Sequence, residues 1–110
     1  MKIESVPYTT VDWNECPVTE HAGEQGIASW KTFEQGNVRS RIVEYSPGYL
    51  ADHWCERGHV IIVLEGELIS ELKDGTKSHL TQGMGYVSSD DEKNPHRSYT
   101  VTGAKLFIVD

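Results

Sequence analysis

Most of the chain consists of short runs in which apolar and polar positions alternate, separated by turn-forming residues. Residues 27–33 and 38–45 are rich in β-branched and aromatic side chains and flank a polar turn over residues 34–37, which predicts two antiparallel strands. Residues 60–64 form a continuous apolar run, and residues 67–72 place acids and apolar side chains on opposite faces. We expect both to be strands, the second with one face in water.

The pair Asp74-Gly75 is the strongest local signal in the sequence. It predicts a hairpin of residues 67–73 with residues 76–81, because an Asp-Gly pair between alternating strands tolerates the positive φ angles of a type I′ turn.

Glu65-Gly66 predicts another tight turn, between the apolar run and the strand that follows it. Three further strands are expected over residues 86–88, 97–101 and 105–109, with a polar acidic loop over residues 89–94. No helical periodicity of any length appears. Short strands with turns about every 8–12 residues predict an all-β sandwich or barrel.

The first part of the chain, residues 1–26, shows little periodicity. We interpret it as an N-terminal arm, with residues 27–110 forming the barrel domain. Tyr8 and Trp13 are large apolar groups that would dock the arm on this body. The arm could instead pack on a second subunit by adding a strand at a sheet edge.

Candidate metal ligands are concentrated in residues 52–59, which contain His53, Cys55 and His59. If this segment is a strand, alternation places His53 and Cys55 on one face and Trp54 on the other. The pair Arg57-Gly58 could then bend the chain and return His59 to the same space.

A fourth candidate ligand, His96, follows Pro95 near the end of the chain. Imidazole nitrogen and thiolate sulfur are donors that bind divalent transition metals. The alternative is structural, because a lone histidine in a strand is most often a hydrogen-bonded residue and a lone cysteine a small buried hydrophobe. Spacing alone leaves both interpretations open. His21 and His79 fall outside the proposed set.

Length and charge narrow the class of protein. A chain of 110 residues fits one domain with a core and a small enclosed pocket. The formal net charge is −7, which repels phosphate backbones, so we expect no nucleic-acid partner.

The two cysteines could form one disulfide at most. No apolar stretch approaches the length of a membrane span, and the first residues do not resemble a secretory signal. We therefore expect no membrane partner and a cytoplasmic protein, in which thiols stay reduced. Cys55 would be available as a thiolate ligand, and Cys16 would be a buried or spare thiol.

Residues from about 45 to 110 resemble the cupin superfamily and, within it, the small DHCW-motif cupin fold proteins. The stretches that carry this resemblance are Ala51-Asp52-His53-Trp54-Cys55, Gly58-His59, residues 64–68 and residues 103–110. It implies a single-domain cupin-type jelly-roll β-barrel.

The first cupin motif runs from Gly48 to Gly66 in this chain, with four residues instead of five after its opening glycine. His53 and Cys55 take its two histidine positions, and His59 takes its glutamate position. In the second motif, which opens at one of the glycines at 83 and 85, the histidine is His96. The asparagine that usually follows this histidine is absent. The resemblance implies a metal ion bound by His53, Cys55, His59 and His96.

These departures change the expected metal. The common cupin set of three histidines and a glutamate suits iron, manganese or nickel, whereas three nitrogens and one thiolate favour zinc, iron(II) or copper. We expect a divalent transition metal as the cofactor, with zinc, iron and nickel as the main candidates.

Three functions fit these residues. The first is a metal-dependent enzyme of oxygenase, isomerase or lyase type, in which the ion acts as a Lewis acid or, if it is iron, binds dioxygen. The second is a closed four-ligand site with a structural or sensing role. The third is a metal-free pocket for a small organic ligand. Homodimers are common among cupin-like barrels, and we expect one here.

The side chains expected to line such a pocket are Tyr49, Trp54, Glu67, Tyr86, Arg97 and Tyr99. Arg97 could pair with a substrate carboxylate. Its alternative role, which we favour, is a surface ion pair with the acids of residues 90–92.

Overall fold

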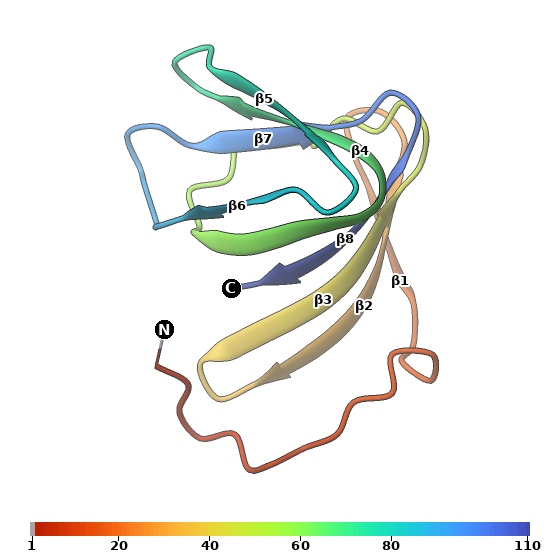
Figure 1. The fold of residues 1–110 in the computed structure, drawn as a ribbon, viewed down its shortest axis with the longest axis vertical. Coiled ribbons are helices and arrows are strands. Elements are labelled where there is room, and N and C mark those ends of the chain that lie inside the picture. The colour runs from red at the N-terminus through yellow and green to blue at the C-terminus, as the bar shows by residue number, and fades with distance from the viewer. Residues whose placement is uncertain (1) are drawn as a thin grey trace.

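The computed structural model describes residues 2–110, which form eight antiparallel strands and no helix (Figure 1). No described segment could therefore cross a membrane as a helix. The strands are β1 (Thr19–Ala22), β2 (Ile27–Gln35), β3 (Val38–Tyr45), β4 (His59–Leu72), β5 (Lys77–Thr81), β6 (Gly85–Ser88), β7 (His96–Tyr99) and β8 (Ala104–Val109). The expected all-β architecture is confirmed.

Strand β4 connects the two layers of the fold. Its first half pairs with β8 and β6, and its second half pairs with β5 and β7. In Figure 1 it curves from the layer of β8, β3, β2 and β1 into the layer of β5 and β7. β4 therefore belongs to both layers.

The predicted tight turn at Glu65-Gly66 is wrong, because β4 continues through it. The pairing with β8 shifts register between Val63 and Glu65, and Gly66 has a φ of 77°. An extra residue and a left-handed glycine bend a strand while its neighbours remain paired. Glu65-Gly66 therefore marks a bend within β4 and not a turn between two strands.

Replacing Gly66 by alanine should destabilise the fold more than replacing Gly75 by alanine. Both glycines have positive φ, but a Cβ at Gly66 would collide with the carbonyl oxygen of Gly103, whereas one at Gly75 meets open space. We expect each variant to lose at least about 1–2 kcal/mol in free energy of unfolding because of the left-handed conformation. The variant at position 66 should lose more. Urea unfolding measures both, and equal losses would contradict the crowding at this bend.

The hairpin at Asp74-Gly75 is confirmed, with Glu71 opposite Lys77. Its turn differs from the prediction. A type I′ turn needs positive φ at both central residues, whereas among residues 2–110 Ser5 is the one non-glycine residue with positive φ. The Gly75 amide donates to the Leu72 carbonyl at 2.9 Å, so the connection is a three-residue loop that ends on a left-handed glycine.

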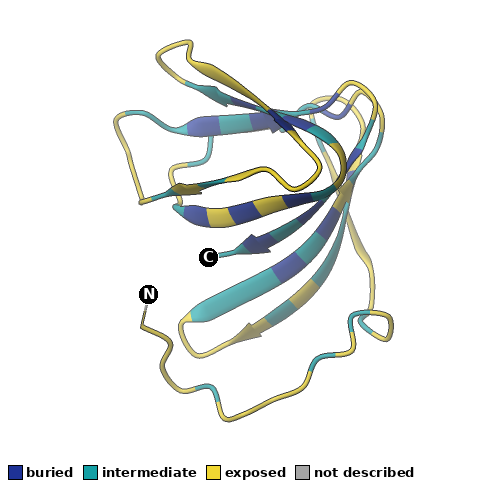
Figure 2. Cartoon of the chain, in the orientation of Figure 1, coloured by how far each residue is buried: buried dark blue, intermediate teal, exposed yellow. Residues whose placement is uncertain are grey.

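The core lies between the two layers. Val43, Val63, Leu68 and Leu106 are at most 1% exposed, and along the first half of β4 buried and exposed residues alternate (Figure 2). The alternation that buries apolar side chains of β4 also turns His59 into the space between the layers.

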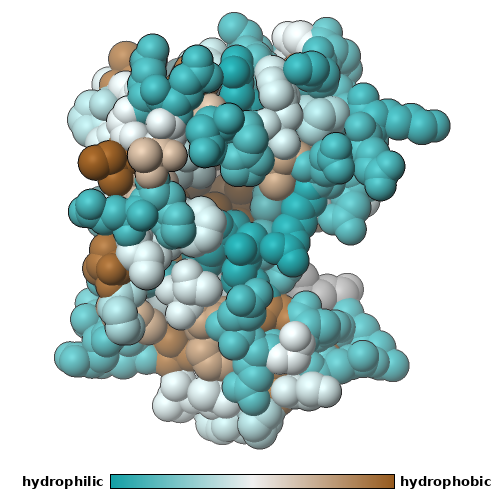
Figure 3. All heavy atoms as spheres, turned by 180° about the vertical axis from the view of Figure 1, so that it is seen from behind, coloured by the Kyte–Doolittle hydropathy of each residue, from teal (hydrophilic) through white to brown (hydrophobic). Residues whose placement is uncertain are grey.

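The N-terminal arm lies against the same chain. Thr19–Ala22 adds an edge strand to β2, and the Trp13 ring packs edge-on against Phe107 at 6.0 Å between centroids. Tyr8 is 98% exposed, so the expectation that it docks the arm is wrong. On the face seen from behind, hydrophobic side chains reach the surface only in separate patches (Figure 3).

Candidate metal centre

Residues 49–55 run beside β7 but do not form a regular strand. The Ala51 amide donates to the Ser98 carbonyl at 3.0 Å, and Cys55 and His96 exchange two backbone hydrogen bonds of 2.7 and 2.9 Å. The chain advances four residues from Ala51 to Cys55, whereas β7 advances only two from Ser98 to His96. The extra residues therefore bulge out of the ladder. The predicted strand through His53 is wrong, and so is the alternation argument that placed it beside Cys55.

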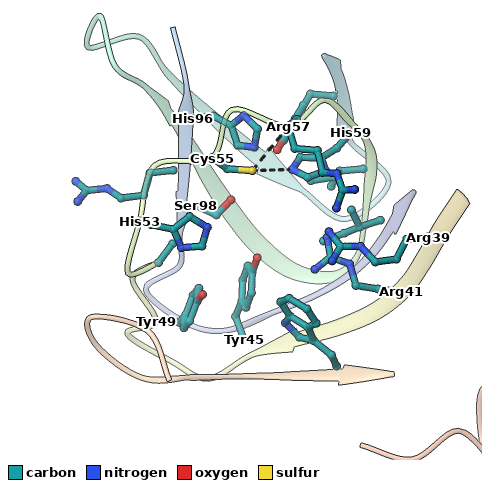
Figure 4. Close-up of a pocket in the computed structure, with 16 residues that line it drawn as sticks. Arg39, Arg41, Tyr45, Tyr49, His53, Cys55, Arg57, His59, His96 and Ser98 are labelled. Atoms are coloured by element: carbon teal, nitrogen blue, oxygen red, sulfur yellow. Dashed lines mark hydrogen bonds between the residues drawn. The ribbon is translucent and has the colours of Figure 1, made fainter. Parts of the chain in front are cut away.

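Three donors nevertheless meet between the layers. Cys55 and His96 lie opposite each other as a backbone-bonded pair, which places their side chains on the same side of the ladder. His59, the first residue of β4, points to the same place (Figure 4). One donor atom from each residue lies within 4.8 Å of the others.

The geometry fits a transition-metal ion. The Cys55 Sγ lies 3.5 Å from the His59 Nε2. Zinc binds sulfur at about 2.3 Å and nitrogen at about 2.0–2.1 Å, which in a tetrahedron separates the two donors by about 3.5 Å. His59 and His96 are each 8% exposed, so the ion would sit largely out of water.

Asp110, at the end of β8, orients His59 from behind. Its Oδ2 lies 2.8 Å from the His59 Nδ1, and its side chain is 1% exposed. The ring N–H does not line up with this oxygen well enough to count as a hydrogen bond, but the short contact still favours the proton on Nδ1. Nε2 is then free as the ligand atom, as in the carboxylate–histidine pairs of metal sites.

Two arginines on the inner face of β3 hold Asp110 in place. Arg39 binds it in bidentate fashion at 2.8 and 2.9 Å, and Arg41 contacts it at 3.2 Å. Burial raises the pKa of Asp110, but the contacts with His59 and the two arginines outweigh this effect and lower it well below its usual range. Asp110 is therefore ionised at neutral pH.

The lowered pKa of the Cys55 thiol suits metal binding, because a thiolate is the form that binds a metal. Contacts with His59 and His96 lower the pKa of Cys55 to about 5, so the thiolate is present at neutral pH. Burial lowers the pKa of His59, but its contacts with Asp110 and Cys55 raise it above the usual value overall. A divalent ion would displace the protons that these groups share.

A cavity of about 320 Å³ opens in front of the three donors. Of the expected lining residues, Tyr49, Tyr86 and Arg97 lie in its wall. Arg97 pairs with Glu71 at 3.2 Å and with Glu24 at 4.0 Å. Its partners are thus not the acids of residues 90–92.

The other expected lining residues lie elsewhere. Glu67 binds His79 at 2.7 Å, and Tyr99 lines another pocket, which shares Tyr49 and Arg97 with this cavity. The Trp54 ring lies under the Arg97 guanidinium at 4.6 Å. None of the three is among the residues around the cavity in front of the three donors.

His53 lies in the cavity wall but outside the cluster of donors. Its side chain is 73% exposed, and its Nδ1 lies 2.7 Å from the Asp52 carboxylate. In Figure 4 it lies on the opposite side of the cavity from His59. The structure thus brings together three of the four expected ligands.

Several residues of the site were not expected from the sequence. Arg39 and Arg41 alternate on residues 38–45 and share a face with Val43 and Tyr45, so the pattern could have placed them inside. No local signal marks Asp110, because its partners lie on β3 and at the start of β4.

Solved structures show the same fold. Fe(II)-HppE with an alternative substrate matches with a TM-score of 0.76 and 14% identity, over 94% of this chain and 60% of that protein. A sugar phosphate isomerase of the cupin superfamily from Silicibacter pomeroyi matches at 0.72 and 16%, over 92% and 74%. A predicted oxalate decarboxylase from Thermotoga maritima matches at 0.73 and 13%, over 92% and 96%.

The chain spans about three fifths of the length of HppE. No protein-family model and no curated protein sequence matches it. The shared architecture covers nearly the whole chain, with the Cys55, His59 and His96 cluster inside it. The chain has the cupin fold, an all-β jelly roll.

Proposed function

We propose that this protein is a metal-dependent enzyme that acts on a small polar organic molecule. Cys55, His59 and His96 hold the ion. The observation that carries the proposal is their convergence within 4.8 Å at the wall of a cavity of about 320 Å³. Catalytic metal sites keep a position open to substrate, and the volume is at the lower end of small-molecule pockets.

A bound ion supplies Lewis-acid chemistry, or redox chemistry if it is iron. Asp110 orients His59, and Arg39 and Arg41 fix Asp110, so the site is held rigidly from one side. The fold neighbours include an Fe(II) protein, an isomerase and a predicted decarboxylase. They support the assignment to oxygenase, isomerase or lyase chemistry, in a member of the DHCW-motif group.

Metal analysis of the full chain tests the proposal. Protein purified without chelator should contain about one zinc, iron or nickel ion per chain, or take one up on reconstitution. Substitution by cobalt(II) should then give a spectrum that changes when small ligands are added, because a coordination position is open. Failure to bind any transition metal would contradict the proposal and favour a pocket for an organic ligand.

His53 decides between an open site and a closed one. Because three donors already meet without it, we expect His53→Gln to lower zinc affinity less than about tenfold, and His96→Gln to lower it by more than the roughly 10–100-fold typical of an outer-shell residue. Chelator competition measures both variants. Equal losses would make His53 the fourth ligand and favour the structural or sensing role.

A cytoplasmic location remains our prediction. It is supported by the two free thiols, which a reducing compartment keeps reduced. A homodimer remains our prediction. It is supported by Val60, Ile62 and Val87, which are 42%, 41% and 79% exposed on neighbouring strands β4 and β6.

A further inference from the structure

All four arginines of the chain line the same cavity. The sequence has a net charge of −7 and contains arginine only at positions 39, 41, 57 and 97, and each lies in the cavity wall. Figure 4 shows Arg39, Arg41 and Arg57 on the side of the cavity where His59 lies. All the guanidinium groups of this acidic protein therefore lie around one small cavity.

Arg41 has more hydrogen-bond donors than the protein uses. It is 5% exposed, and its guanidinium lies 4.3 Å from the centre of the Trp30 ring. A guanidinium has five N–H donors. Among residues 2–110, Asp110 is its one hydrogen-bond acceptor, at 3.2 Å, and the buried Nε has none. Buried donors are normally paired, so this group is suited to a further acceptor.

The carboxylates near the cavity do not balance these charges. Asp110 is shared by Arg39, Arg41 and His59. Arg97 has its own acids on β4 and before β2, and Arg57 forms no ion pair within residues 2–110. The cavity wall itself contains no aspartate or glutamate from the described chain.

A purely structural role explains only some of the arginines in the cavity wall. Arg39 and Arg41 could be present only to hold Asp110 behind His59, and that role is satisfied by the contacts already described. It does not explain Arg57, which is exposed at the cavity and holds nothing in place with its side chain.

We propose that the cavity binds a small organic molecule that carries an oxyanion, a carboxylate or a phosphoryl group, and that Arg41 and Arg57 recognise this group. Planar guanidinium forks pair with the two oxygens of such groups. Because Arg41 and His59 contact the same Asp110, the bound oxyanion lies beside the three metal-ligand candidates. This inference rests on the proposed function and names its substrate class.

Binding of simple probes tests the proposal. Methylphosphonate and acetate are titrated into the full chain, both zinc-loaded and chelator-treated, with uncharged acetamide as the match for acetate. NMR shifts of the cavity residues report binding. We expect the anions to bind in both samples and acetamide in neither, because the arginines act without the metal. The stronger of the two anions identifies the group that is recognised.

Two variants assign the binding to the arginines. Arg57→Gln should weaken anion binding by about tenfold or more, the effect of losing a charge-assisted hydrogen bond. Lys31→Gln makes the same charge change outside the cavity and should leave binding unchanged. Arg41→Lys keeps the charge but loses the fork, and it should reduce the preference for the anion over acetamide.

Three results would overturn the proposal. They are the absence of anion binding in both samples, equal binding of acetamide, and binding that neither arginine variant alters. Metal content is measured on the same samples. Zinc without anion binding would refute this inference alone, and anion binding without any metal would refute the proposed function alone.

Discussion

Replacing Cys55 by serine should lower zinc affinity more than any other single change at the candidate site. The substitution removes the one sulfur donor of the cluster, whose thiolate is already formed at neutral pH because the pKa is lowered to about 5. We expect at least about a hundredfold loss, the upper range for losing an outer-shell partner. Competition against a chromophoric chelator measures the dissociation constant.

Two controls make this result specific. Cys16→Ser removes the other cysteine, which lies in the N-terminal arm with its Sγ 3.6 Å from the Asp12 carbonyl, and should change nothing at the metal. His79→Gln removes a histidine of β5 that contacts Glu67 on β4, and it should also leave the metal affinity unchanged. Cobalt(II) bound to the unaltered chain should show a sulfur charge-transfer band that the Cys55 variant lacks. Unchanged affinity of the Cys55 variant would exclude this residue as a ligand.

Replacing Asp110 by asparagine should cause the largest loss of stability. The variant removes the carboxylate that binds Arg39 and Arg41. The Asp110 side chain is 1% exposed, so water does not replace it. Removing one partner of a buried ion pair typically costs about 3–5 kcal/mol. Glu44→Gln, in the exposed pair with Lys105, is the matched control and should cost less than about 1 kcal/mol.

The effect of Asp110→Asn should depend on pH in a defined direction. The pKa of Asp110 is lowered in the folded chain, so its contribution is complete above the unfolded value of about 3.9 and disappears as the pH falls through the folded value. Urea unfolding should show a constant difference between the two proteins near neutral pH and a shrinking one below about pH 4. A difference that grows in acid would contradict the ion-pair network.

The same variant should also weaken metal binding. Asp110 contacts the His59 Nδ1 at 2.8 Å, and loss of an outer-shell carboxylate typically costs about 10–100-fold in metal affinity. Full zinc affinity in a folded Asp110 variant would show that His59 needs no orientation from behind.

The sequence by itself determined the local features of this protein. The apolar run after His59 predicted the strand that this histidine begins, and Asp74-Gly75 predicted the hairpin. These features depend on side-chain period and turn conformation, which a few neighbouring residues set. The resemblance to cupins added the jelly roll, which the fold neighbours confirm.

Only the tertiary structure decided which distant residues meet. His53 lies outside the cluster because residues 51–55 bulge against β7. Arg41 contacts Asp110 because β3 pairs with β8. Such contacts depend on the register between strands far apart in the chain, which local alternation does not specify. Three of the four candidate ligands that the sequence suggested therefore lie together, whereas the charged wall of the cavity could not be predicted from the sequence.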